Sequence, residues 1–159
     1  IDGLDKVTGA ATYVDDIDFG PGLLYAEIVE SPHAHALIKN IDTSGAEQMP
    51  GVVKTVTAKD FPHTFGLYMK DRYIFTRDRV RFVGEQVAAV IAHDPATAKR
   101  AAKLVRVTYE PLTPVLDLAE ALKPNAALVH PDLEHYEHCP WFFPRPKTNI
   151  AHWRKTRRE

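Results

Sequence analysis

The stretch RVRFVGEQVAAVIAHDPATAKRAAKLVRVTY, residues 79–109, decides the fold that the sequence predicts. Its middle part, residues 86–92, follows Gly84-Glu85 and is almost entirely apolar. A strand that is buried on both faces has this composition, whereas a half-exposed strand alternates apolar and polar residues. We therefore predict a fully buried strand over residues 86–92.

A helix is expected directly after this strand. Asp94 is a good N-cap, and Pro95 fits the first helical position, where its missing N–H costs nothing. The spacing of the small apolar residues predicts a buried face made of Ala98, Ala101, Ala102 and Val105. Residues 105–109 then alternate as a second strand. This strand–helix–strand unit would be right-handed if its two strands pair in parallel.

The other elements are shorter. Strands are expected at residues 23–30 and 52–57, and residues 6–14 are mildly strand-like. Ser44 and Glu47 have capping-box spacing and predict one helical turn, and Asp117 caps a short helix over residues 118–122. The predicted fold class is α/β (α+β), a mixed sheet with a central strand–helix–strand crossover and a short second helix. We expect one domain over residues 1–129 and an extended Pro-rich, aromatic and basic arm over residues 130–159.

Composition narrows the function classes. The 159 residues are 45% hydrophobic and 26% charged with a formal net charge of -1, so we expect no nucleic-acid partner. No apolar run approaches ~18 residues, so we expect no membrane span. The single cysteine, Cys139, points to a reducing, cytoplasmic location. The first residues lack the pattern of a signal peptide, and the chain is compatible with a cut-out fragment or a separate subunit.

Three sets of residues are candidates for metal binding. The cluster His130, His135, His138 and Cys139 offers soft ligands within ten residues, although it matches no established zinc spacing. His33 and His35 would share one face of a strand but lack a third ligand. Asp16 and Asp18 suggest a calcium loop, except that Pro21 replaces the required glycine. For each set the alternative is an ordinary structural role, and we predict no catalytic, cofactor-binding or metal-binding residue in this chain.

Trp141, Phe142 and Phe143 form the candidate interface. Three adjacent aromatic residues in an extended arm are costly to expose to water, and the arm is too short to build its own core. We expect them to insert into a neighbouring chain or domain, with packing on this domain as the alternative.

Several blocks together resemble the molybdopterin-binding large subunit of xanthine dehydrogenase and aldehyde oxidase-type hydroxylases. They occur in the order of that family: Asp2-Gly3, Lys6-Val7-Thr8-Gly9, Ser31-Pro32-His33-Ala34-His35-Ala36, Ile41-Asp42-Thr43-Ser44, Pro50-Gly51-Val52-Val53, Asp78-Arg79-Val80-Arg81-Phe82-Val83-Gly84-Glu85, Val107, Tyr109-Glu110 and Leu128-Val129-His130-Pro131-Asp132. The resemblance implies the N-terminal α/β hammerhead domain of that subunit.

The resemblance also implies what the whole enzyme does. It would oxidise a C–H centre of a heterocycle or aldehyde with a molybdopterin-type molybdenum cofactor, and pass electrons through two [2Fe–2S] clusters, usually to FAD. These groups belong to downstream molybdopterin-binding domains and to iron–sulfur and FAD subunits or domains, so this chain alone is expected to be inactive and to bind none of them. The alternatives are a stand-alone protein-binding module that uses the aromatic arm, and a metal-binding domain.

Overall fold

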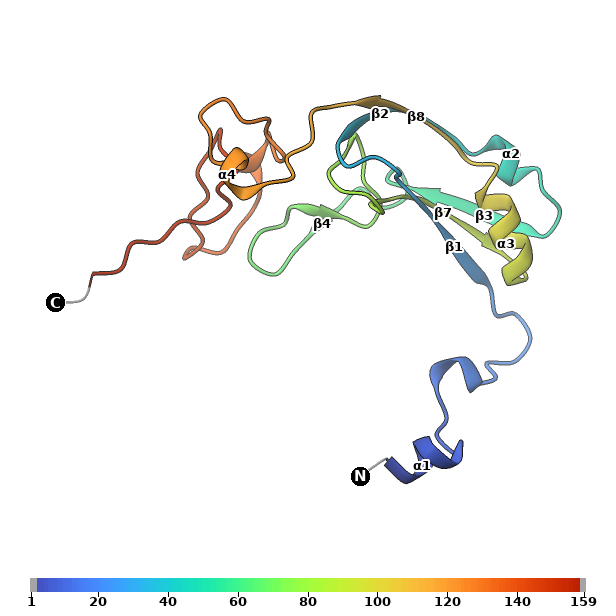
Figure 1. Ribbon diagram of the computed structural model, residues 1–159. Helices are drawn as coiled ribbons and strands as arrows, with labels where there is room; N and C mark the ends of the chain where they lie inside the picture. Colours follow the sequence, from blue (N-terminus) through green and yellow to red (C-terminus); the bar gives the residue numbers. More distant parts are fainter. Residues whose placement is uncertain (1–2, 158–159) are drawn as a thin grey trace.

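Strand β7 (Gln86–Ala92) lies in the middle of a three-stranded sheet, between β1 (Tyr25–Glu30) and β3 (Val52–Thr57). Both neighbours run antiparallel to it. The computed structural model describes residues 3–157, and Figure 1 shows the helix that follows β7 next to this sheet. Five of its seven residues are buried, namely Val87, Ala88, Ala89, Val90 and Ala92. The predicted buried strand is confirmed.

Helix α3 (Pro95–Ala102) follows β7 and covers one face of this sheet. The Asp94 side chain accepts a hydrogen bond from the Thr97 backbone N–H at 2.8 Å, as an N-cap does. Ala98 and Ala101 are buried, and Ala101 packs in one cluster with Val90. The cap is confirmed, and so is the burial of Ala98 and Ala101. Ala102 and Val105 of the predicted face are only half-buried, and Val105 lies beyond the end of the helix.

A second sheet places β2 (Ala36–Asp42) between β6 (Arg79–Val80) and β8 (Arg106–Pro111), again with antiparallel pairing. Strands β7 and β8 therefore belong to different sheets, and α3 carries the chain from one sheet to the other. The parallel pairing that we considered for these two strands is not formed. Both edges of β7 are already occupied by β1 and β3, so β7 has no free edge for β8. The mixed α/β fold class itself is confirmed.

The core continues from one sheet to the other. Its middle cluster contains the buried side chains Ala36 from β2, Val80 from β6 and Val87 from β7, with Val29, Ile38, Ile41, Val107 and Tyr109 packed around them. The main chain adds a further link, because Ser31 N–H donates to the Glu85 carbonyl at 2.9 Å and Gly84 N–H donates to the Ser31 carbonyl at 2.8 Å. Gly84 has φ of 88°, a left-handed conformation that favours glycine.

The two predicted short helices are present as α2 (Ser44–Glu47) and α4 (Leu118–Ala121). Residues 6–14 are not a strand, because the chain forms α1 (Gly3–Thr8) and the 3-10 helix η1 (Val14–Asp16) there. Local hydrogen bonds decide this, since Asp16 Oδ2 accepts from the Tyr13 N–H at 2.9 Å and no strand of the described chain lies beside the segment to pair with it.

A C-terminal lobe (residues 112–157) contains α4 and the 3-10 helix η2 (Leu133–His135). It lies beside the hairpin formed by β4 (Thr64–Phe65) and β5 (Arg72–Tyr73). The lobe and the N-terminal segment lie at opposite ends of the sheets (Figure 1). The predicted domain boundary after Val129 stays a prediction. Among residues 3–157, no helix has the length and apolar character to cross a membrane.

Replacement of Ala101 by glutamate tests the packing of α3 on β7. Ala101 is fully buried, so Ala101→Glu places an unpaired charge in the core and is expected to cost at least about 3 kcal/mol of unfolding free energy. The matched control is Ala96→Glu in the exposed first turn of the same helix, where a carboxylate is favourable. Urea unfolding followed by far-UV circular dichroism measures both. Equal midpoints for the two variants would contradict this packing.

Candidate functional site

The C-terminal arm lies against the β4–β5 hairpin of its own chain. The Lys70 N–H donates to the Glu137 carbonyl at 2.8 Å, and the Cys139 N–H donates to the Tyr68 carbonyl at 2.9 Å. An exposed ion pair between Lys70 Nζ and Glu137 adds a third contact at 2.8 Å. Backbone hydrogen bonds therefore hold the arm on the hairpin in the manner of an added strand.

The predicted aromatic interface divides into two parts. Phe142 packs on its own chain, because its ring is stacked on Tyr68 with a centroid distance of 6.3 Å and on His152 with a distance of 4.8 Å. Trp141 and Phe143 remain 65% and 54% exposed, although the Phe143 ring also stacks on His152 with a centroid distance of 6.0 Å. The insertion of the three aromatic residues into a neighbouring surface thus stays a prediction, and Phe142 has the most ring contacts within its own chain.

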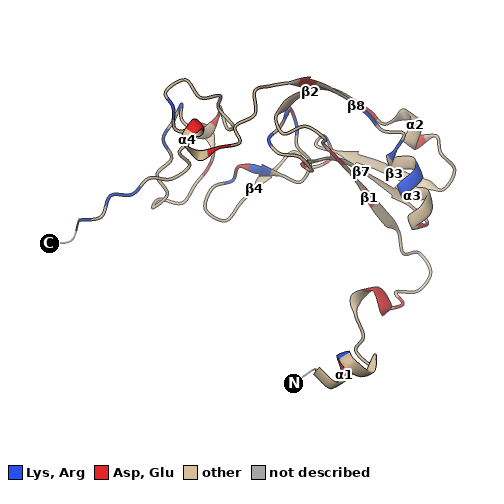
Figure 2. Cartoon of the chain, viewed as in Figure 1, with Lys and Arg blue, Asp and Glu red and all other residues tan. Residues whose placement is uncertain are grey.

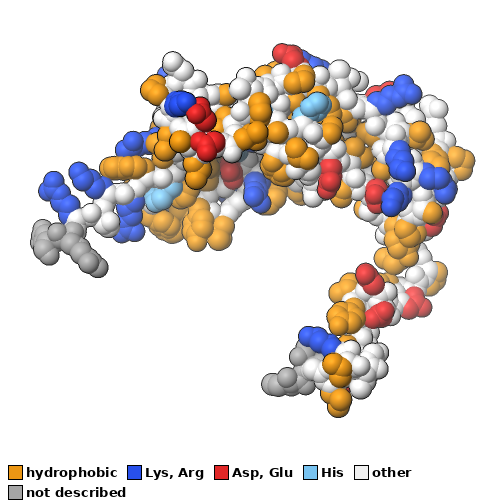
Figure 3. All heavy atoms as spheres, viewed as in Figure 1, with side chains coloured by type: hydrophobic (Ala, Val, Ile, Leu, Met, Phe, Trp, Pro, Cys, Tyr) orange, Lys and Arg blue, Asp and Glu red, His pale blue; other side chains and the backbone are white. Residues whose placement is uncertain are grey.

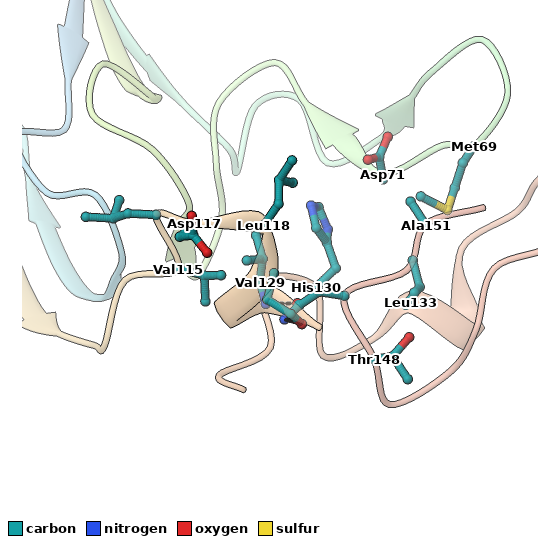
Figure 4. Close-up of a pocket in the computed structure, with 13 residues that line it drawn as sticks. Met69, Asp71, Val115, Asp117, Leu118, Val129, His130, Leu133, Thr148 and Ala151 are labelled. Atoms are coloured by element: carbon teal, nitrogen blue, oxygen red, sulfur yellow. Dashed lines mark hydrogen bonds between the residues drawn. The ribbon is translucent and has the colours of Figure 1, made fainter. Parts of the chain in front are cut away.

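A pocket of about 350 Å³ opens between the hairpin and the C-terminal lobe (Figure 4). Met69 and Asp71 reach it from the hairpin, and Leu118 and His130 line it from the lobe. Most of the other lining residues are apolar: Val115, Leu116, Ala121, Val129, Leu133 and Ala151. The Asp117 carboxylate at its edge is committed to the α4 cap, where it accepts from the Glu120 N–H at 3.0 Å.

Asn149 lines this pocket and holds the lobe together. Its Oδ1 accepts from the Val129 N–H at 2.9 Å, and its Nδ2 donates to the carbonyls of Ala127 at 2.9 Å and Ala121 at 3.2 Å. One side chain thus ties together three backbone positions that lie twenty or more residues away in the sequence. The sequence did not point to Asn149, because no local pattern links it to residues 121–129.

A polar cluster lies between the lobe and the second sheet. His130 Nδ1 lies 3.2 Å from the Tyr136 hydroxyl, and burial, assisted by the Arg81 guanidinium, lowers the pKa of His130. The Arg81 and Glu85 side chains are only 10% and 15% exposed, and the Glu85 carboxylate accepts the Arg81 backbone N–H. Burial raises the pKa of Glu85, while Arg81 acts in the opposite direction. The arrangement connects the lobe to the body of the domain.

The histidine pair His33 and His35 does not lie on a strand, since both residues precede β2, which begins at Ala36. The expected common face is therefore wrong. His33 packs edge-on against Tyr109 at 4.8 Å. His35 Nδ1 lies 2.7 Å from the Thr113 carbonyl and must donate to it, so Nε2 accepts from Arg79 Nη1 at 3.1 Å. Both nitrogens of this buried ring are occupied by structural contacts.

The four candidate soft ligands in the arm do not converge. His130 contacts Tyr136, His138 Nδ1 lies 3.0 Å from the Cys139 carbonyl, and Cys139 Sγ is directed at the Leu67 carbonyl at 3.7 Å. His135 is largely exposed. Within residues 3–157, no group of three or more His, Cys, Asp or Glu side chains is arranged to hold a metal ion.

The suggested calcium loop is an ordinary acidic turn. Asp16 accepts from the Tyr13 N–H, and Asp18 Oδ1 accepts from the Gly20 N–H at 2.8 Å. Each carboxylate thus stabilises the local backbone, as short acidic side chains commonly do in turns.

Asn149→Leu is expected to loosen the lobe. It leaves one N–H and two carbonyls without their partner, at a cost of about 1–2 kcal/mol for partly exposed groups. Both tryptophans, Trp141 and Trp153, lie in the lobe, so tryptophan fluorescence during urea unfolding reports on it directly. Asn125→Leu, at an exposed position of the same lobe, is the matched control. A midpoint shift no larger than that of the control would contradict the proposed role of Asn149.

Phe142→Ala and Trp141→Ala separate the two parts of the aromatic triplet. Loss of the stacked Phe142 ring should lower stability by about 1–2 kcal/mol, whereas loss of the exposed Trp141 ring should change it by less than about 0.5 kcal/mol. The fluorescence of Trp153, which both variants retain, follows unfolding in urea. The reverse order of the two effects would show that Trp141, and not Phe142, anchors the arm.

Comparison with known proteins identifies the family. Residues 8–113 match the family model described as "Aldehyde oxidase and xanthine dehydrogenase, a/b hammerhead domain". The chain is 41% identical over 133 residues to a probable xanthine dehydrogenase component from Bacillus subtilis, and the match covers 82% of this chain and 18% of that protein. It is 39% identical over 131 residues to the carbon monoxide dehydrogenase large chain of Afipia carboxidovorans, with 79% and 16% covered.

Solved structures of molybdenum-containing and aldehyde-oxidising enzymes share the fold of this chain. The Cu,Mo-CO dehydrogenase in its carbon monoxide reduced state superimposes with a TM-score of 0.74 at 36% identity, covering 83% of this chain and 17% of that chain. The aldehyde oxidoreductase from Desulfovibrio desulfuricans gives a TM-score of 0.74 at 32% identity, covering 82% and 16%. The chain thus spans less than a fifth of the length of these relatives. The resemblance found in the sequence is confirmed, and the chain belongs to the aldehyde oxidase and xanthine dehydrogenase family, in which it forms the a/b hammerhead domain.

Proposed function

We propose that this chain is the scaffold domain of a xanthine dehydrogenase-like molybdenum hydroxylase and has no catalytic role of its own. The whole enzyme would oxidise a C–H centre of a heterocycle or an aldehyde. The observation that carries this proposal is the match of residues 8–113 to a single domain type, in relatives that are more than five times longer than the matched region.

The molybdenum cofactor would be held by other parts of that enzyme. The pocket between the hairpin and the C-terminal lobe does not fit an anionic cofactor, because its lining is mostly apolar and its charged members Asp71 and Asp117 are acidic.

The expected partners follow from the same proposal. They are the molybdopterin-binding domains that would follow this domain, and the iron–sulfur and FAD subunits or domains that would carry electrons away from molybdenum. We propose a cytoplasmic location for the assembly, in keeping with the single cysteine.

Metal analysis of two purified proteins tests the proposal. The polypeptide that contains this chain together with its downstream part, purified with its natural partners, should hold close to one molybdenum per large subunit and show iron–sulfur absorbance. The 159-residue chain alone should hold no molybdenum, show no flavin or iron–sulfur absorbance and hydroxylate no substrate. Stoichiometric molybdenum on the isolated chain, or none in the complete assembly, would contradict the proposal.

A stand-alone protein-binding module is the second candidate. The exposed rings of Trp141 and Phe143 favour it, since solvent-exposed aromatic side chains are common at protein interfaces. A natural gene product of only this length, without neighbouring molybdopterin-binding domains, would support the module and exclude the first proposal.

A further inference from the structure

The N-terminal segment (residues 3–22) is folded locally but has no core. It projects away from the sheets (Figure 1), and none of its residues is buried. Six of its large apolar side chains are between 46% and 82% exposed: Leu4, Val7, Tyr13, Val14, Ile17 and Phe19. Such a concentration of exposed apolar surface is unusual in a free-standing protein and marks a contact region.

The segment presents these side chains in a preformed arrangement. Leu4 and Val7 are three residues apart on α1 and therefore share a face of the helix. The 3-10 helix η1 is fixed by Asp16, which accepts from the Tyr13 N–H. Preformed local structure lowers the entropy that must be lost on binding. The segment is thus suited to docking into a groove.

Its charge indicates the character of that groove. The segment contains four aspartates, Asp5, Asp15, Asp16 and Asp18, and one lysine, Lys6. Figure 3 shows the acidic groups between the apolar ones on this segment. An acidic and apolar surface is repelled by anionic membranes and complements an apolar groove with a basic rim.

We infer that the N-terminal segment docks into an apolar, basic-rimmed groove of the downstream part of the same polypeptide. This inference rests on the proposed function, which assigns a long downstream part to this chain. Two observations favour the downstream part, and not an independent protein, as the docking partner. Residues 8–22 belong to the region that matches the hammerhead family, and in the relatives more than four fifths of the chain lies outside the matched region. Docking of this segment would attach the hammerhead domain to the domains that follow it.

Photo-cross-linking in the complete polypeptide tests the inference. The photoreactive residue p-benzoylphenylalanine is placed at Val14, and in a control at Lys99 on the exposed face of α3. After irradiation, peptide mass spectrometry should identify a cross-link within one polypeptide, from position 14 to a residue beyond 159. The Lys99 control should give at least tenfold less of such a product.

A charge variant tests the basic rim. Asp15→Lys should reduce the yield of the position-14 cross-link at least threefold, whereas Glu134→Lys, an exposed exchange in the lobe, should leave it unchanged. An equal cross-link yield in the two variants would overturn the prediction that the groove has a basic rim.

Other outcomes overturn the inference itself. One is a cross-link from position 14 to residues 25–157, to a second copy of the chain or to another protein. Another is the absence of any cross-linked peptide, which is the result expected if the segment binds lipid. Molybdenum content, measured on the unsubstituted polypeptide, separates the two proposals: molybdenum without the cross-link refutes the docking alone, and the cross-link without molybdenum refutes the proposed function alone.

Discussion

The enclosure of one strand governs this fold. Strand β7 is bonded on both edges by β1 and β3 and carries α3 on one face, so its backbone and side chains are almost completely removed from water. Val87 reaches the second sheet on the other face, where it packs with Ala36 and Val80. Residues from both sheets and from α3 meet around this strand, and each would lose apolar contacts if the strand were displaced.

The sequence predicted the elements whose causes are local. The apolar run of β7, the Asp94 cap with Pro95, and the Asp117 cap all depend on residues within a few positions of each other. Strand pairing depends on residues far apart, and it could not be derived: nothing in residues 105–109 indicates that β8 joins β2 rather than β7. The N-terminal helix was missed because Val7, Val14 and Tyr13 favour strands, while the described chain places no partner strand nearby to realise that preference.

The same distinction applies to the candidate site. The composition of the aromatic triplet drew attention to residues 141–143, but the stacking of Phe142 on Tyr68 joins two parts of the chain that are far apart in the sequence. His33 and His35 were singled out by residue type, and their roles are set by Tyr109, Thr113 and Arg79, which the spacing cannot indicate. The basic and aromatic C-terminal arm and the acidic N-terminal segment lie at opposite ends of the sheets (Figure 2). The domain is thus well packed in its middle and exposes large apolar side chains at both ends.

Native-state hydrogen exchange on the 159-residue chain tests the central claim, the enclosure of β7, most directly. Exchange of a buried amide requires opening of the structure around it, and the slowest amides report global unfolding. The slowest set should be the hydrogen-bonded amides of Gln86–Ala92, while those of the N-terminal segment should exchange fastest. A slowest set located in β8 or in the C-terminal lobe, with β7 exchanging earlier, would contradict the account.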